Sequence, residues 1–204
     1  MEHLEIEVKF HVLDLNRMRR RLMENGAQAR GRVFEANTLW DTPEKDLARQ
    51  GSVLRLRQDA GCRLTLKSRV PAADPRFKTH RELETVVQDC RIMEGILSGM
   101  GFCPTHCYEK YRETFALPDV QAVLDETPYG VFLELEGGKE SIMEVARRLE
   151  LDWSRRIVLS YLEMFAILKK EEALDFSDAT FSSFSGRKVS LAKYLPRFEA
   201  GKTP

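Results

Sequence analysis

The chain has 204 residues, 43% of them hydrophobic and 31% charged, which is enough apolar material for a sizeable core and argues against a disordered chain. Its 32 Lys and Arg balance its 32 Asp and Glu, so a general nucleic-acid-binding protein, which depends on excess positive charge, is not expected. The first residues lack the basic and apolar regions of a signal peptide, and no apolar run approaches about 18 residues, so we expect a cytoplasmic protein without a membrane span.

The predicted strands alternate apolar and polar residues, and the predicted helices carry an apolar stripe between capping residues. In chain order, the strands are expected at residues 4–10, 32–40, 52–57, 62–67, 80–87, 108–115, 120–125 and 131–136. The helices are expected between Asp14 and Gly26, near 45–49, between Asp89 and Gly101, at 141–149 and after Ser160. Residues 70–79 hold two prolines and show no periodicity, which predicts a mobile loop. Because most strands follow one another through short turns, we expect one antiparallel α+β domain over residues 1–174.

The last segment, residues 175–204, is rich in Ser and Phe and then basic, without a clear period. We therefore expect a C-terminal appendage of uncertain structure. Its candidate packing residues are Phe181, Phe184, Leu191, Tyr194 and Leu195.

The four cysteines are Cys62, Cys90, Cys103 and Cys107. Four cysteines in a chain this long do not suggest a disulfide framework, so we expect reduced thiols in a reducing compartment. Residues 103–107 resemble half of a zinc site, but the sequence offers no second half.

The polar faces of the predicted strands carry charges that are sorted by sign. These faces hold Glu5, Glu7 and Lys9; Arg55 and Arg57; Arg63, Thr65 and Lys67; Glu82 and Glu84; Lys110 and Arg112; and Glu134 and Glu136. Taken singly, each residue fits a solvated surface or a cross-strand ion pair. Taken together, they suggest a closed barrel whose lumen is charged and whose apolar outer face is covered by helices. Burying so many charges is costly unless they are paired or bind ligands, so such a lumen suits a polyanion with a metal ion.

The first strand, Glu5-Ile6-Glu7-Val8-Lys9, resembles the Glu-x-Glu-x-Lys signature of the CYTH superfamily, also called triphosphate tunnel metalloenzymes. That superfamily includes class IV adenylate cyclases, thiamine triphosphatases and inorganic triphosphatases. Further motifs follow in the family's order: Asp41-Thr42, Leu54-Arg55-Leu56-Arg57, Leu64-Thr65-Leu66-Lys67, Glu82-Leu83-Glu84, Glu109-Lys110-Tyr111-Arg112, Leu124-Asp125-Glu126, Glu134-Leu135-Glu136 and Ser160-Tyr161-Leu162. The resemblance covers residues 1–168 and implies a closed antiparallel eight-stranded barrel with helices packed outside.

The resemblance also implies roles for individual residues. The implied catalytic set is Glu5, Glu7, Lys9, Glu134 and Glu136, whose four carboxylates would hold Mg²⁺ or Mn²⁺. The implied triphosphate-binding residues are Lys9, Arg55, Arg57, Lys67, Lys110, Arg112 and Arg81. Secondary candidates are Arg63, Thr65, Glu82, Glu84 and Asp125.

Three functions are compatible with these residues. The first hypothesis is a metal-dependent triphosphatase that acts on tripolyphosphate, thiamine triphosphate or a nucleoside triphosphate. The second is a class IV adenylate cyclase, in which the ribose 3′-hydroxyl attacks the α-phosphorus and pyrophosphate leaves. The third is a polyphosphate-binding module without turnover, which would gain little from four metal-site acids. The expected partner is a small triphosphate molecule; the sequence leaves the oligomeric state open.

Overall fold

The structure is a computed structural model that describes residues 2–187 and 189–200. Its eight strands are β1 (Glu2–His11), β2 (Gln28–Asp41), β3 (Ser52–Gln58), β4 (Cys62–Arg69), β5 (Lys78–Val87), β6 (Cys103–Leu117), β7 (Val120–Thr127) and β8 (Gly130–Gly137). They form a closed barrel in the order β1-β5-β4-β3-β2-β6-β7-β8, and every neighbouring pair is antiparallel. The predicted α+β barrel is therefore confirmed.

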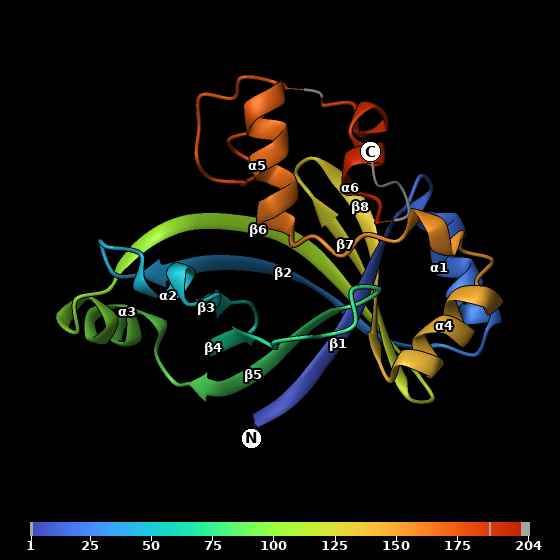
Figure 1. Cartoon of the computed structure of the whole chain (residues 1–204), viewed down its shortest axis with the longest axis horizontal. Coiled ribbons are helices and arrows are strands. Elements are labelled where there is room, and N and C mark those ends of the chain that lie inside the picture. The colour runs from blue at the N-terminus through green and yellow to red at the C-terminus, as the bar shows by residue number, and fades with distance from the viewer. Residues whose placement is uncertain (1, 188, 201–204) are drawn as a thin grey trace.

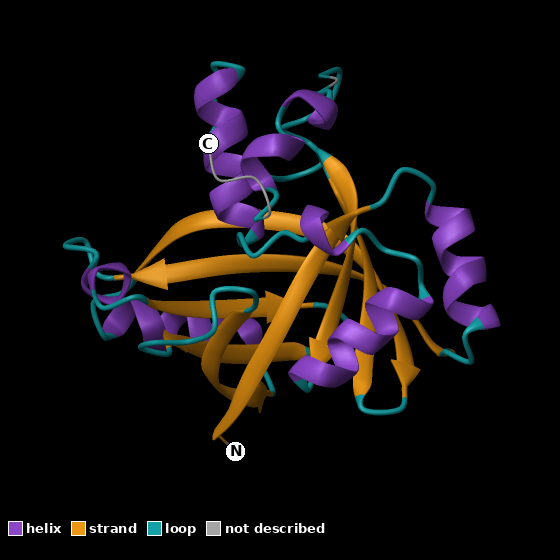
Figure 2. Ribbon diagram, turned by 45° about the vertical axis from the view of Figure 1, so that its right-hand side comes forward, coloured by secondary structure: helices purple, strands orange, loops and turns teal. Residues whose placement is uncertain are grey.

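Helices and the C-terminal segment surround the barrel from outside (Figure 1). The helical elements are α1 (Leu15–Glu24), α2 (Asp46–Arg49), α3 (Cys90–Gly99), α4 (Lys139–Arg148), η1 (Trp153–Arg155), α5 (Tyr161–Glu171), η2 (Leu191–Lys193) and α6 (Leu195–Phe198). Helices α1 and α4 lie on one side of the barrel, α3 lies at the opposite end, and α5 lies next to the C-terminal segment (Figures 1 and 2). Within the described residues, no helix combines the length and apolar character needed to cross a membrane.

Alternation along the strands places the hydrophobic core outside the barrel wall. Val8 and Phe10 of β1 are buried in a cluster with Leu22 of α1 and Ile142 of α4. On the other side, Leu54 and Leu56 of β3 pack in a cluster with Leu97 of α3. Because side chains alternate along a strand, the polar neighbours of these residues face the lumen. The fold thus turns each charged strand face inward.

The C-terminal segment has a defined structure and contributes to the core. Ala179, Phe184, Leu191, Tyr194, Leu195 and Phe198 are buried in one cluster with Phe132 of β8 and Phe165 of α5. Isolated bridges also join Tyr108 to Ala179 and Ile157 to Glu199. Four of the five candidate packing residues, Phe184, Leu191, Tyr194 and Leu195, thus pack as expected and complete the packing around α5. A domain boundary at residue 174 stays a prediction.

The structure contradicts the expectation of reduced thiols for two of the four cysteines. Cys62, at the start of β4, and Cys90, at the start of α3, form a disulfide with their Cα atoms 5.7 Å apart. They are 28 residues apart in the sequence, and only the return of α3 onto β4 brings them together. Cys103 and Cys107 are free.

Candidate active site

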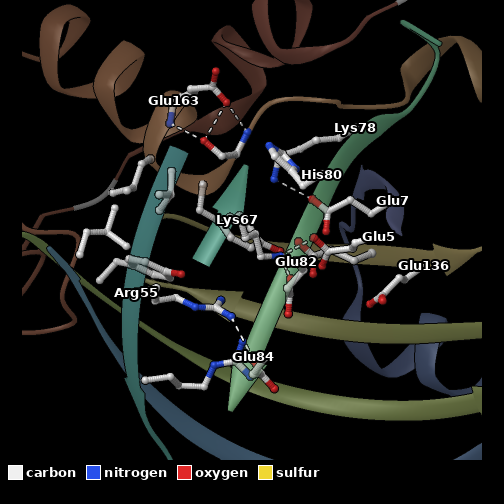
Figure 3. Close-up of a pocket in the computed structure, with 18 of the residues that line it drawn as sticks. Glu5, Glu7, Arg55, Lys67, Lys78, His80, Glu82, Glu84, Glu136 and Glu163 are labelled. Atoms are coloured by element: carbon white, nitrogen blue, oxygen red, sulfur yellow. Dashed lines mark hydrogen bonds and ion pairs between the residues drawn. The ribbon is translucent and has the colours of Figure 1, made fainter. Parts of the chain in front are cut away.

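The barrel encloses a cavity of about 590 Å³ whose wall is mainly charged (Figure 3). Its lining includes Glu5, Glu7, Lys9, Arg55, Arg57, Lys67, Lys78, His80, Glu82, Glu84, Tyr108, Lys110, Arg112, Glu134 and Glu136. Ser160 to Glu163, at the start of α5, also line it. The structure thus brings together all five implied catalytic residues and six of the seven implied triphosphate-binding residues.

Lys9 lies at the centre of the carboxylates of β1 and β8. These two strands are neighbours, and their register pairs Lys9 with Glu134 and Glu7 with Glu136. The Lys9 Nζ lies 2.5 Å from Glu7 Oε1 and 3.0 Å from Glu134 Oε1, and the side chain is 1% exposed. Although burial alone would lower the pKa of Lys9, Glu134 and Glu7 raise it above its ordinary value. This lysine therefore stays charged.

A second group of acids surrounds Lys67. Its ammonium group is ion-paired with Glu5 and lies 2.8 Å from Glu82 Oε2. Burial and the neighbouring Glu7 nevertheless raise the pKa of Glu5. For Glu136, burial and the charges of Glu5 and Glu7 raise the pKa to about 7. Negative charge is thus concentrated here beyond what the nearby lysines compensate, as Figure 3 illustrates for the acids near Lys67.

The opposite part of the wall is rich in cations. Arg112 contacts Asp125 through two hydrogen bonds, Nε to Oδ1 at 2.7 Å and Nη2 to Oδ2 at 2.6 Å. Lys110 and the Tyr161 hydroxyl each donate to the same Asp125 Oδ2 at 2.8 Å, and Arg112 also pairs with Glu134. Although burial would raise the pKa of Asp125, Arg112 and Lys110 hold it below its ordinary value. Asp125 is fully buried and does not line the cavity, so it supports these cations from behind.

On β3 and β4, Arg55 is held by a short polar chain. Its Nη2 donates to Thr65 Oγ1 at 3.2 Å, and the Thr65 hydroxyl donates to Glu84 Oε2 at 2.8 Å. Arg55 also lies 3.8 Å from Glu84 Oε2 (Figure 3). Thr65 and Glu84 thus fix the direction in which Arg55 enters the cavity.

Known proteins are similar to this chain in sequence and in fold. The family model described as the CYTH domain matches residues 3–178. The chain belongs to the CYTH family. It is 27% identical over 173 residues to "Putative adenylate cyclase MJ0240" of Methanocaldococcus jannaschii, a match that spans 79% of this chain and 98% of that protein.

Solved structures of other proteins have a similar fold. The PH1012 protein of Pyrococcus horikoshii is 26% identical, with a TM-score of 0.67, and the match covers 78% of this chain and 98% of that one. "Putative adenylyl cyclase HpAC1" of Hippeastrum, described as having a dominant triphosphatase activity, is 20% identical with a TM-score of 0.58, over 82% of this chain and 96% of that one. The latter likeness shows the fold alone.

The carboxylates suit the metal ion that a CYTH fold implies. Carboxylate oxygens are hard ligands of the kind that Mg²⁺ and Mn²⁺ prefer. Burial and the charges of Glu5 and Glu7 raise the pKa of Glu136 to about 7, and a cation between these acids would relieve the repulsion. Among the described residues, no three His, Cys, Asp or Glu side chains are arranged to enclose a metal ion, since lysines contact several of the acids. The carboxylate oxygens thus fit a metal ion by their chemistry. Lysines contact several of these acids and compensate part of the negative charge of the carboxylates.

Besides Asp125 and Thr65, which contact cations of the wall, two further residues assigned from the sequence do not line the cavity. Arg81 is exposed, because it alternates with Glu82 on β5 and Glu82 faces the lumen. Its assignment to the triphosphate-binding set is therefore corrected. Arg63 does not line the cavity either, and its Nη1 lies 2.7 Å from Asp59 in the turn between β3 and β4.

The lumen also contains residues that the sequence reasoning missed. Lys78 and His80 line the cavity, and Lys78 Nζ lies 2.8 Å from Glu7 Oε1. They continue the inward alternation of Glu82 and Glu84 toward the start of β5; assigning residues 70–79 to a loop hid Lys78, whereas His80 lay within the predicted strand. Burial and the charge of Lys78 lower the pKa of His80 to about 4, so this imidazole is neutral near pH 7. Glu35, on β2, is 1% exposed and contacts several lumen cations.

Proposed function

We propose that this CYTH protein is a metal-dependent triphosphatase that hydrolyses a phosphoanhydride bond of a small triphosphate. One observation carries the proposal: a cluster of carboxylates and a set of lysines and arginines face into the same cavity. The repulsion between Glu5, Glu7 and Glu136 favours a bound cation. The facing cations favour a polyanion, and a metal–triphosphate complex satisfies both requirements.

In this proposal, each set of side chains has a defined task. Glu5, Glu7, Glu134 and Glu136 hold Mg²⁺ or Mn²⁺, which neutralises phosphate charge and orients a water molecule when bound. Lys9, Arg55, Arg57, Lys67, Lys110 and Arg112 bind the phosphate oxygens. Because hydrolysis spreads negative charge over the transferred phosphoryl group, fixed cations in a buried site stabilise its transition state.

Four further side chains act through the cations they contact, namely Asp125, Thr65, Glu82 and Glu84. Asp125 holds Arg112 and Lys110, and the pair Thr65–Glu84 holds Arg55. Preset positions of this kind reduce the ordering that a bound substrate must impose on long, flexible side chains.

Adenylate cyclase activity is the second candidate. It is supported by the archaeal relative, whose name refers to that activity and 98% of which is matched by this chain. The same tunnel would then direct the ribose 3′-hydroxyl to the α-phosphorus in place of water to a terminal phosphorus. A binding module without turnover is the third candidate, and the cluster of four metal-site carboxylates argues against it.

A product assay distinguishes the three candidates. The protein is incubated with ATP, tripolyphosphate or thiamine triphosphate, each with Mg²⁺ and with Mn²⁺, and the products are separated by anion-exchange chromatography. Orthophosphate supports the triphosphatase, cyclic AMP with pyrophosphate supports the cyclase, and unchanged substrate supports the binding module. The Glu134→Gln variant is the control for a contaminating phosphatase, because it removes an implied metal ligand while keeping the side-chain volume.

A further inference from the structure

Glu35 of β2 is a buried carboxylate that contacts three cations of the cavity wall. It is 1% exposed and does not itself line the cavity. Its carboxylate oxygens lie 3.2 Å from Arg57 Nη1, 3.7 Å from Lys110 Nζ and 4.0 Å from Arg112 Nε. Strand β2 lies between β3 and β6, so one side chain reaches the cations of both neighbouring strands. Glu35 shares the inward face of β2 with Leu39, which lines the cavity, so it lies inside the barrel and is buried against these cations.

The electrostatics agree with this placement. Although burial would raise the pKa of Glu35, the cations Lys110, Arg112 and Arg57 lower it to about 2. Burial and the neighbouring Arg55 lower the pKa of Arg57, and the charge of Glu35 opposes that shift. Among the ion pairs of the described residues, Arg57 has Glu35 as its acidic partner, whereas Lys110 and Arg112 share Asp125 as well.

We propose that Glu35 is a positioning residue, a buried counter-ion that holds Arg57, Lys110 and Arg112 in place for the triphosphate. This inference rests on the proposed function, which assigns phosphate binding to those three cations. Removing the charge of Glu35 should therefore have opposite effects on triphosphate affinity and on the rate of turnover. Glu35 compensates the cations in the empty cavity, and it also fixes where they meet the phosphate oxygens.

The Glu35→Gln variant separates these effects. Without the carboxylate, the buried cations lack compensation, so a polyanion that supplies it gains affinity relative to the wild-type protein. The same cations lose their fixed position, and misplaced groups reduce the rate of the chemical step. We therefore expect tighter binding of inorganic tripolyphosphate together with slower turnover.

Two measurements test this expectation. The dissociation constant of inorganic tripolyphosphate is measured by calorimetry in EDTA, and kcat is measured with Mg²⁺ and the best substrate. In Glu35→Gln, the dissociation constant should fall about threefold or more and kcat about tenfold or more. Glu35→Asp keeps the charge at a shorter reach, so its dissociation constant should stay within about twofold of wild type while kcat falls about threefold or more. Glu113→Gln is the matched control, because Glu113 pairs with Arg19 of α1 outside the barrel, and it should change neither quantity.

Each result decides the inference. Unchanged or weaker tripolyphosphate binding in Glu35→Gln overturns the counter-ion role, and unchanged kcat with tighter binding overturns the positioning role. If circular dichroism shows that Glu35→Gln does not fold, Glu35→Asp decides, and an unchanged kcat in that variant overturns the inference. If the wild-type protein turns over no triphosphate, the proposed function fails, while the dissociation constants still test Glu35. A wild-type protein that does not bind tripolyphosphate overturns both.

Discussion

Replacing Lys9 by methionine is expected to destabilise the protein to an extent that depends on pH. Methionine keeps most of the side-chain volume but leaves Glu7 and Glu134 buried without the ammonium group they share. Removing one partner of a buried ion pair costs about 3–5 kcal/mol of unfolding free energy. Glu7 retains Lys78 at 2.8 Å and Glu134 retains Arg112, so we expect the lower end, about 3 kcal/mol.

The sign of the pH dependence follows from the two carboxylates. Burial alone would raise the pKa of Glu7 and of Glu134, but Lys9 and the other cations hold both below the ordinary value of 4.5. Their stabilising contribution is therefore present above pH 4.5 and is lost as the pH falls below it. Without Lys9 both pKa values rise, so protonation at mildly acidic pH relieves part of the cost. The loss of stability in Lys9→Met should be larger at about pH 8 than at about pH 5.

Thermal unfolding followed by circular dichroism in EDTA measures this effect. For a chain of this size, about 3 kcal/mol corresponds to a fall of about 6–12 °C in Tm. Lys139→Met is the control, because Lys139 is partly exposed and lies 3.5 Å from Asp74, so its loss should cost less than about 1 kcal/mol. A Tm loss that is equal at both pH values, or no larger than that of the control, would refute the reasoning.

Glu136→Gln should raise the Tm at about pH 8 in EDTA and raise it much less at about pH 5. Burial and neighbouring acids raise the folded pKa of Glu136 to about 7, so its ionised form is unfavourable in the folded protein. A lower Tm for this variant at about pH 8 would contradict that account. Arg55→Ala should weaken tripolyphosphate binding about tenfold or more in calorimetry, whereas Arg81→Ala, outside the lumen, should change it less than about twofold; equal losses would contradict the assigned faces. Phe198→Ala should cost about 3–5 kcal/mol in urea unfolding, and a cost under about 1 kcal/mol would show that the C-terminal segment adds little to the core. Reduction of the disulfide with dithiothreitol, verified by alkylation and mass spectrometry, should cost about 2–4 kcal/mol, and an unchanged unfolding curve would argue against its stabilising role.

Alternation in the strands allowed the barrel and most of the lumen to be predicted from the sequence. Because the side-chain period of a strand is two, the pattern around Arg55 and Arg57 placed both arginines on the face opposite Leu54 and Leu56. Arg81 is a counterexample, since its position next to Glu82 already implied the outer face. The assignment of Arg81 to the triphosphate-binding set comes from the family resemblance and not from the alternation.

Contacts between distant segments could not be predicted in the same way. The disulfide joins Cys62 to Cys90 because α3 returns onto β4, and no local pattern encodes that return. Glu35 lies in a strand that was predicted, but its three cationic contacts depend on the order of β3, β2 and β6 in the barrel. The packing of Phe198 likewise depends on how the C-terminal segment meets α5.

A crystal structure with Mn²⁺ and a non-hydrolysable imido analogue of tripolyphosphate tests the central claim most directly. Anomalous scattering locates the manganese independently of the phosphates. We expect manganese bound by carboxylates from the set Glu5, Glu7, Glu134 and Glu136, and phosphate oxygens in contact with Arg55, Arg57, Lys110 and Arg112. Manganese or analogue bound outside the barrel, with the ion pairs of Lys9 unchanged and the lumen free of phosphate, would contradict the account.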